Sequence, residues 1–275
     1  MIFLILAIIS SASISVIMRL SSKVVTGRLS MLWANYLVCL ALSAIYFLPT
    51  LPVSGSMAGT AIMGSVTGFL FLGGFVLFQH NTRENGVVLS SVFMKLGLLV
   101  PMCLSIFLFR EIPGWLQGLG FALAVIAIVV MDMPQGDRSK NKWGLILLLL
   151  VGGCGDAMSK VFEVLGQSSQ SALFLLFLFV TAFVLCGILV FVGKERPKGK
   201  DILFGIALGV PNFFSAKFLL AALQQLPAVI VYPTFSVATI LTVTVAGIAL
   251  FKERLGKRQW IALALILAAL VFLNI

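Results

Sequence analysis

The sequence predicts an all-α integral membrane protein with ten transmembrane helices arranged as two inverted five-helix repeats. Two observations support this fold class, an apolar composition and an internal repeat. Hydrophobic residues make up 61% of the 275-residue chain and charged residues only 10%, and the mean hydropathy is +1.16. Because the bilayer core has no water to bond backbone groups, the chain must cross it as helices or as a closed barrel, and the apolar runs here are far longer than barrel strands.

Each apolar run has a length of about 20 residues, which is what a helix needs to cross the bilayer. The first run lacks a basic region at its start and a small-residue cleavage site, so we interpret it as a membrane helix and not as a signal peptide. The expected spans are 2–20, 30–49, 60–79, 87–109, 113–131, 144–163, 171–192, 202–223, 229–250 and 257–274.

The internal repeat is visible when the two halves of the chain are aligned at an offset of 142 residues. Gly114 then falls on Gly256, and Phe109-Arg110-Glu111 falls on Phe251-Lys252-Glu253. Duplication of this kind in an apolar chain is typical of carriers built from two homologous helix bundles. We expect residues 1–135 to form the first repeat and residues 136–275 the second.

The net charge of +10 is distributed over alternate loops and predicts the topology. By the positive-inside rule the cation-rich loops are cytoplasmic, which places both termini outside. Five helices per repeat, an odd number, invert the second copy, so homologous loops should show opposite charge bias, as they do. A surface that attracts anionic lipid would explain the cations but not their alternation. The opposite loops hold only Arg110 and Lys160, whereas the rich set holds Arg19, Lys23, Arg28, Arg83, Arg138, Lys140, Lys142, Lys194, Arg196, Lys198, Lys200, Lys252, Arg254, Lys257 and Arg258.

Several short motifs resemble the EamA-type carriers of the drug/metabolite transporter superfamily. In the second half they are Ala222 to Ala228, Tyr232-Pro233, Phe251 to Leu255 and Gln259 to Ile261, and weaker versions occur at 86–91, 109–111 and 117–118. The resemblance implies the ten-helix inverted-repeat fold and a transport function. It leaves the substrate class open among amino acids, other metabolites, sugars, nucleotide sugars and toxic cations. It also implies cytosolic termini, in contrast to the charge distribution.

Two lysines within the predicted spans, Lys95 and Lys217, are the main candidates for substrate binding. A charge at the membrane centre costs about 2.5 to 3.5 kcal/mol and usually faces a cavity. In the fold that the chain resembles, the helices of both lysines border the central cavity, so we expect the ammonium groups to bind a carboxylate or phosphate of the substrate. In the alternative interpretation, Asp156 neutralises one of them or the buried lysine is uncharged.

Asp156 is the only carboxylate deep in a predicted span. We interpret it as a coupling residue that binds and releases a proton during transport. An intrahelical ion pair with Lys160, one turn later, is the competing interpretation.

Polar side chains complete the expected substrate site. Ser91 lies one turn before Lys95, Asn212 follows Pro211, and further hydroxyl groups lie along one face of the span 229–250, at Tyr232 and Ser236. Hydroxyl groups in membrane helices also join one helix to another, and this alternative stays open.

Two further motifs predict packing and anchoring. Glycines four residues apart let membrane helices approach closely, and such pairs occur in the spans 60–79 and 202–223, at Gly64 and Gly68 and at Gly205 and Gly209. Glu111 and Glu253 occupy matching positions directly after a cation at a helix end. We interpret both as interfacial anchors and not as catalytic acids.

The sequence therefore predicts a secondary transporter that moves a small polar metabolite with a negative group, an amino acid or a related organic acid, with export as the leading direction. Proton coupling or exchange is expected, since no nucleotide-binding loop occurs. The alternatives are efflux of toxic cations and a lipid-linked flippase or accessory membrane subunit. An enzyme is not expected, because clustered acids, a metal-binding set and a nucleophile with its base are all missing.

The expected partners follow from this function. They are a small-molecule substrate and membrane lipid, with a homodimer as an open alternative and with no nucleic acid, cofactor or metal. The expected location is the inner (plasma) membrane if the protein is bacterial.

Overall fold

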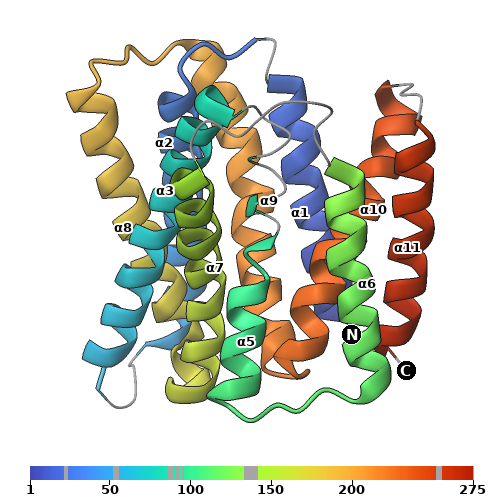
Figure 1. Cartoon of the computed structure of the whole chain (residues 1–275). Coiled ribbons are helices and arrows are strands. Elements are labelled where there is room, and N and C mark those ends of the chain that lie inside the picture. The colour runs from blue at the N-terminus through green and yellow to red at the C-terminus, as the bar shows by residue number, and fades with distance from the viewer. Residues whose placement is uncertain are drawn as a thin grey trace. The chain divides into compact units, whose positions relative to one another are not determined.

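The computed structural model describes residues 1–21, 24–51, 56–85, 90, 93–94, 96–132, 142–251 and 256–274. Ten α-helices and two short 3-10 helices, Leu48–Thr50 and Ser168–Gln170, occur within them, and these residues form no strand (Figure 1). The α-helices are α1 (Ile2–Ser21), α2 (Arg28–Phe47), α3 (Ala58–Asn85), α5 (Leu99–Phe107), α6 (Trp115–Asp132), α7 (Lys142–Leu165), α8 (Ser171–Val192), α9 (Gly199–Leu223), α10 (Ala228–Phe251) and α11 (Lys257–Asn274). The prediction of an all-α chain is confirmed for this part of the sequence.

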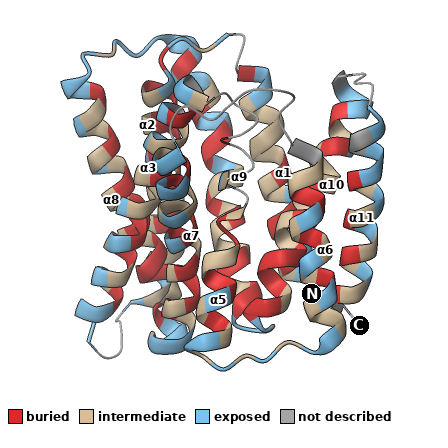
Figure 2. Ribbon diagram, viewed as in Figure 1, coloured by how far each residue is buried: buried red, intermediate tan, exposed pale blue. Residues whose placement is uncertain are grey.

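Most of these helices have the length and composition of membrane spans. Among the described residues, seven helices are long and apolar enough to cross a bilayer, namely α1, α2, α3, α7, α8, α9 and α10. Shorter apolar helices run over Trp115–Val130 and Trp260–Leu273, in α6 and α11. Buried and exposed positions alternate along the helices (Figure 2), and many of the exposed positions carry large apolar side chains, such as Phe69, Ile188, Phe191 and Val271. Apolar exposed side chains are what a helix in contact with lipid requires.

The helices form two compact units, and each unit draws on both halves of the chain. The first unit comprises Met1–Leu72 and Val161–Gln224, and it contains α1, α2, α8 and α9. The second comprises Gly73–Lys160 and Gln225–Ile275, and it contains α5, α6, α10 and α11. The division between the units falls inside α3 and inside α7, so both of these helices contribute to each unit.

Glycines bring the helices of the first unit close together. Gly205 and Gly209 of α9 face α2, where a Cβ atom built on Gly209 would lie only 2.5 Å from the Cβ of Val38. Similarly, Gly64 and Gly68 of α3 face α8. The four-residue glycine spacing therefore serves close helix packing, as predicted.

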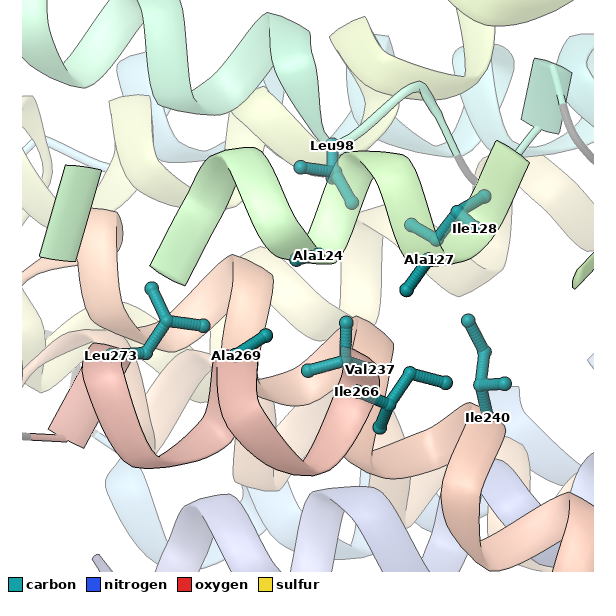
Figure 3. Packing of buried hydrophobic residues seen from close by; sticks show 9 residues of the cluster. All are labelled: Leu98, Ala124, Ala127, Ile128, Val237, Ile240, Ile266, Ala269 and Leu273. Atoms are coloured by element: carbon teal, nitrogen blue, oxygen red, sulfur yellow. The ribbon is translucent and has the colours of Figure 1, made fainter. Parts of the chain in front are cut away.

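The core of the second unit is an apolar cluster shared by α6, α10, α11 and the turn before α5 (Figure 3). Small alanines on α6 and α11 let these two helices approach, and branched side chains of α10 fill the remaining space. The buried members are Leu98, Ala124, Ala127, Ile128, Val237, Ile240, Ile266, Ala269 and Leu273.

The predicted span 87–109 differs from the structure in one respect. The helix α5 begins at Leu99, after a turn at Gly97 and Leu98. Pro101 has no amide hydrogen to donate to the carbonyl oxygen of Gly97, which accepts a tighter bond from the amide of Val100 at 2.9 Å. The turn packs against α7, since a Cβ atom on Gly97 would lie 3.1 Å from the amide nitrogen of Gly153. Glycine at both positions permits this contact.

Candidate functional site

Lys217 lies on α9 in the first unit, and its ammonium group contacts an aromatic ring. Its Nζ atom lies 3.8 Å from the centre of the Tyr46 ring of α2. A cation over an aromatic face gains about 0.5 to 2 kcal/mol, more when water is excluded. No carboxylate of the described residues pairs with Lys217. The lysine lies six residues before the end of α9, about 9 Å along the axis, which is halfway between the middle of the helix and its end.

Asn212, also on α9, donates a hydrogen bond from Nδ2 to Oδ1 of Asn35 at 3.1 Å. Asn35 belongs to α2 and is 1% exposed. Its own Nδ2 group has no hydrogen-bond partner among the described residues. A buried amide donor without a partner costs about 1 to 3 kcal/mol, and a polar ligand or water that accepts from it recovers that cost. The pair places a polar group near the middle of two apolar helices.

Asp156 lies on α7 in the second unit, and its side chain is half-buried. No ion pair or hydrogen bond joins its carboxylate to the residues that the structure describes. Lys160, one turn later, instead pairs with Glu111, with 2.6 Å between Nζ and Oε1. The intrahelical ion pair between Asp156 and Lys160, which was the alternative to a coupling role, is therefore not formed. Lys160 pairs with Glu111 from another part of the chain.

Tyr232 joins α10 to the same region of α7. Its hydroxyl group donates to the backbone carbonyl oxygen of Asp156 at 2.7 Å, and the residue is 2% exposed. Ser236 lies one turn further along α10 and is half-buried. Of the residues predicted for the substrate site, Tyr232 thus contacts the backbone of Asp156, and Ser236 lies on the same helix as Tyr232. Lys217 and Asn212 belong to the first unit. Lys95 and Ser91 lie outside the described residues.

Asn35 and Tyr46 are not among the residues predicted from the sequence for the site, although both contact predicted site residues. Asn35 is an amide within an apolar span, which is a signal of the same kind as Asp156. Tyr46 lies at the end of α2 and gives no such signal, because an aromatic ring at a helix end is common at membrane interfaces. Within the part of the chain that the structure describes, no group of three His, Cys, Asp or Glu residues could hold a metal ion.

These features define a multi-pass integral membrane protein with polar groups inside its helical units. Residues 141–275 match the model of the EamA-like transporter family. This part of the chain is therefore similar to the EamA-like transporter family, and the predicted resemblance to the family is confirmed. The family is part of the drug/metabolite transporter superfamily and consists of transporters and not of enzymes, which also confirms the prediction that the chain is not an enzyme.

Two full-length similarities accompany the family match. An uncharacterized protein of Haemophilus influenzae is 25% identical over 281 residues, which cover 97% of this chain and 95% of that protein. A protein of known crystal structure matches with a TM-score of 0.77 and 13% sequence identity, over 99% of this chain and 98% of the other. The second similarity shows that the two chains share a fold.

Proposed function

We propose that the protein is a secondary transporter of a small polar metabolite with a negative group, an amino acid or a related organic acid, with export as the direction. The observation that carries this proposal is the Lys217 ammonium group, which contacts the Tyr46 ring and no carboxylate of the described chain. A substrate carboxylate or phosphate would balance this charge. The Asn35 amide, on the same helix as Tyr46, has a buried donor without a partner among the described residues, and we assign it to water or to a polar group of the substrate.

Asp156 is the group that we assign to coupling. Support comes from its carboxylate, which has no described partner and so is available to bind a proton. The turn at Gly97 and Leu98 packs against Gly153, one turn before Asp156. Interrupted helices near the substrate and ion sites are a recurring feature of secondary transporters.

We further propose that the ten helices form two inverted repeats, 1–135 and 136–275. The glycine pairs support this arrangement, because α3 packs on α8 through Gly64 and Gly68, and α9 packs on α2 through Gly205 and Gly209. In such an arrangement α3 is the counterpart of α9, and α2 is the counterpart of α8. The contact of α3 with α8 is then equivalent to the contact of α9 with α2.

The hydrogen bonds between helix ends support an arrangement in which successive helices cross the membrane in opposite directions. In a ten-helix chain each such bond must join two connections on the same side. The described bonds meet this condition, among them Thr26 to Asp201, Ser30 to Glu195, Thr60 to Gln170, Asn81 to Gly144, Gln224 to Ser171 and Ala228 to Glu111.

The charge distribution predicts that both termini are external. A fluorescent protein fused to the C-terminus, which is dark when it is exported unfolded, should therefore give little signal, while a phosphatase fused at the same place should be active. A fusion between α8 and α9, in the connection that contains Lys194 and Lys198, should give the opposite pattern. A fluorescent C-terminal fusion would contradict the prediction and support the cytosolic termini that the family resemblance implies.

The substrate proposal predicts that anionic or zwitterionic metabolites stabilise the purified protein through Lys217. Thermal unfolding in detergent should be measured with a panel of amino acids, organic acids, phosphorylated metabolites, sugars and quaternary amines. At 100 times Kd a ligand adds about 2.7 kcal/mol of stability. We expect Lys217→Met to need a ligand concentration about tenfold higher or more for the same stabilisation, since loss of one charge-assisted contact costs about 1.5 to 3 kcal/mol.

Lys200 provides the matched control, because it lies on the same helix α9 and is exposed. Lys200→Met should leave the stabilisation by ligand unchanged. Stabilisation by an anionic ligand that is equal in the wild type and in Lys217→Met would overturn the role of Lys217.

Efflux of a cation is a second candidate function, and one observation favours it. The Asp156 carboxylate without a described partner would suit a positively charged substrate as well as a proton. In the same panel, stabilisation by quaternary amines that is lost in Asp156→Asn and kept in Lys217→Met would select this function.

A further inference from the structure

The carboxylate of Glu111 binds two other parts of the second unit at once. Its Oε1 atom pairs with Nζ of Lys160 on α7 at 2.6 Å. Its Oε2 atom accepts hydrogen bonds from the backbone amides of Ala228 at 2.8 Å and Val229 at 3.4 Å. These amides are the first two of α10, where the helix dipole and the unpaired N–H groups favour a negative charge. The Lys160 side chain is 5% exposed and that of Glu111 19%, so the group is largely shielded from solvent.

The backbone holds Glu111 in position for these contacts. The preceding residue, Arg110, has a positive φ of 55° and reverses the chain at the end of α5. The amide of Glu111 then donates to the carbonyl oxygen of Ser105 at 3.0 Å. A left-handed residue followed by a bond back to the helix is a common way to end a helix, although glycine is the usual residue there. An arginine in this conformation indicates that the position of the next side chain is constrained.

A similar arrangement occurs in the first unit and provides a comparison. Lys194 has a positive φ of 50°, and the amide of Glu195 donates to the carbonyl oxygen of Val190. The Glu195 carboxylate accepts from the amide and the hydroxyl group of Ser30 at 2.9 and 2.8 Å, at the start of α2. Both glutamates thus follow a left-handed cation and cap the start of a distant helix. Only the α10 cap is joined through Glu111 to the helix that carries Asp156.

A second bond lies one helical turn from the first on both helices. From Ala228 one turn along α10 leads to Tyr232, and from Lys160 one turn back along α7 leads to Asp156. The Tyr232 hydroxyl group donates to the Asp156 carbonyl oxygen at 2.7 Å. Two contacts one turn apart determine the register of one helix on another, because a helix held at a single point can still rotate and slide.

We propose that Glu111 is a positioning residue for Asp156. By holding the start of α10 against Lys160, its carboxylate keeps Tyr232 bonded to the Asp156 backbone and thereby fixes the segment of α7 that carries the coupling carboxylate. The part of the proposal that concerns coupling rests on the proposed function of Asp156. The part that concerns the contacts of Glu111 does not depend on it.

The first experiment tests the contacts by chemical rescue. Glu111→Ala removes the carboxylate but keeps the Lys160 ammonium group and the α10 amides, so formate should enter the vacated space and raise the melting temperature. Wild type should not respond, and the double variant Glu111→Ala with Lys160→Met should respond much less. If Glu111→Ala does not fold, Glu111→Gln keeps an oxygen acceptor for Ala228 and should be less stable than wild type. Absence of rescue in a folded Glu111→Ala protein, or wild-type stability of Glu111→Gln, would overturn the proposal.

The second experiment tests the effect on coupling in reconstituted vesicles. Glu111→Gln should lower the maximal rate of uptake driven by a pH gradient about fivefold or more while KM changes little, since a loss of about 1 kcal/mol in the free energy that holds Asp156 in place is a factor of about five in rate. Glu195→Gln is the matched control, because it weakens a comparable cap in the first unit, and its rate should stay close to that of wild type. Equal losses in both variants would assign Glu111 a structural role alone. If Asp156→Asn keeps gradient-driven transport, the proposed function of Asp156 fails, while a positive formate rescue still stands.

Discussion

Gly209→Leu is expected to prevent the first unit from forming. At this position α9 lies against α2, and even a single Cβ atom would approach the Asn35 carbonyl oxygen to 2.8 Å and the Val38 Cβ to 2.5 Å. A backbone oxygen cannot move aside as a flexible side chain can, so the helices must separate. Overpacking costs about 3 kcal/mol at the upper end of its usual range, and separation would also break the bond between Asn35 and Asn212. The measurement is the melting temperature and the monodisperse fraction in size-exclusion chromatography.

Gly199 is the control for this substitution, since it begins the same helix and no atom lies within 4 Å of a Cβ atom built on it. Gly199→Leu should behave like the wild type. A Gly209→Leu protein that is monodisperse and melts at the wild-type temperature would show that α2 and α9 do not pack as described.

Asp156→Asn is expected to uncouple transport from the proton gradient. Asparagine has nearly the same size and keeps the backbone carbonyl to which Tyr232 donates, so the fold should be preserved. It cannot bind and release a proton near neutral pH, so uptake in the presence of a pH gradient should fall to the rate measured without a gradient. Exchange of labelled for unlabelled substrate across the vesicle membrane, which needs no net proton movement, should continue.

Glu84 provides the comparison for Asp156, because it is an exposed carboxylate at the end of α3. Glu84→Gln should retain gradient-driven uptake. Retention of that uptake in Asp156→Asn would remove Asp156 from coupling, and loss of exchange as well would indicate a role in binding the substrate.

The helices and the glycine contacts could be predicted from the sequence because each depends on a pattern within one segment of the chain. Apolar runs of bilayer length predict helices because no other structure satisfies the backbone in lipid. The spacing of Gly205 and Gly209 predicts close packing because it places both glycines on one face of a helix. Neither pattern indicates which helix lies against the glycines, and only the structure shows that α9 packs on α2. The turn at Gly97 was missed for the same reason, since it depends on Pro101 together with contact to Gly153 on another helix.

The candidate site was predicted as a set of residue types but not as a set of contacts. A buried charge is conspicuous in an apolar run, which is why Lys217 and Asp156 could be identified from sequence. The contacts of these residues could not be predicted, because Tyr46 is distant from Lys217 in sequence and is ordinary at a helix end, as Tyr232 is distant from Asp156. Lys160 illustrates the difference, since Asp156 lies one helical turn before it in sequence, yet in the structure its ammonium group pairs with Glu111.

The interleaving of the two units has a consequence for the biosynthesis of the protein. The first unit needs residues up to Gln224, and the second needs residues up to Ile275. During synthesis α1 and α2 must therefore remain in the membrane without α8 and α9 while most of the chain is still being made. Throughout that interval Asn35 lacks the amide of Asn212 to which it is bonded in the finished protein. The long apolar helices keep each segment stable in lipid by themselves, and the few polar and glycine contacts then select which helices associate once the last of them has been inserted.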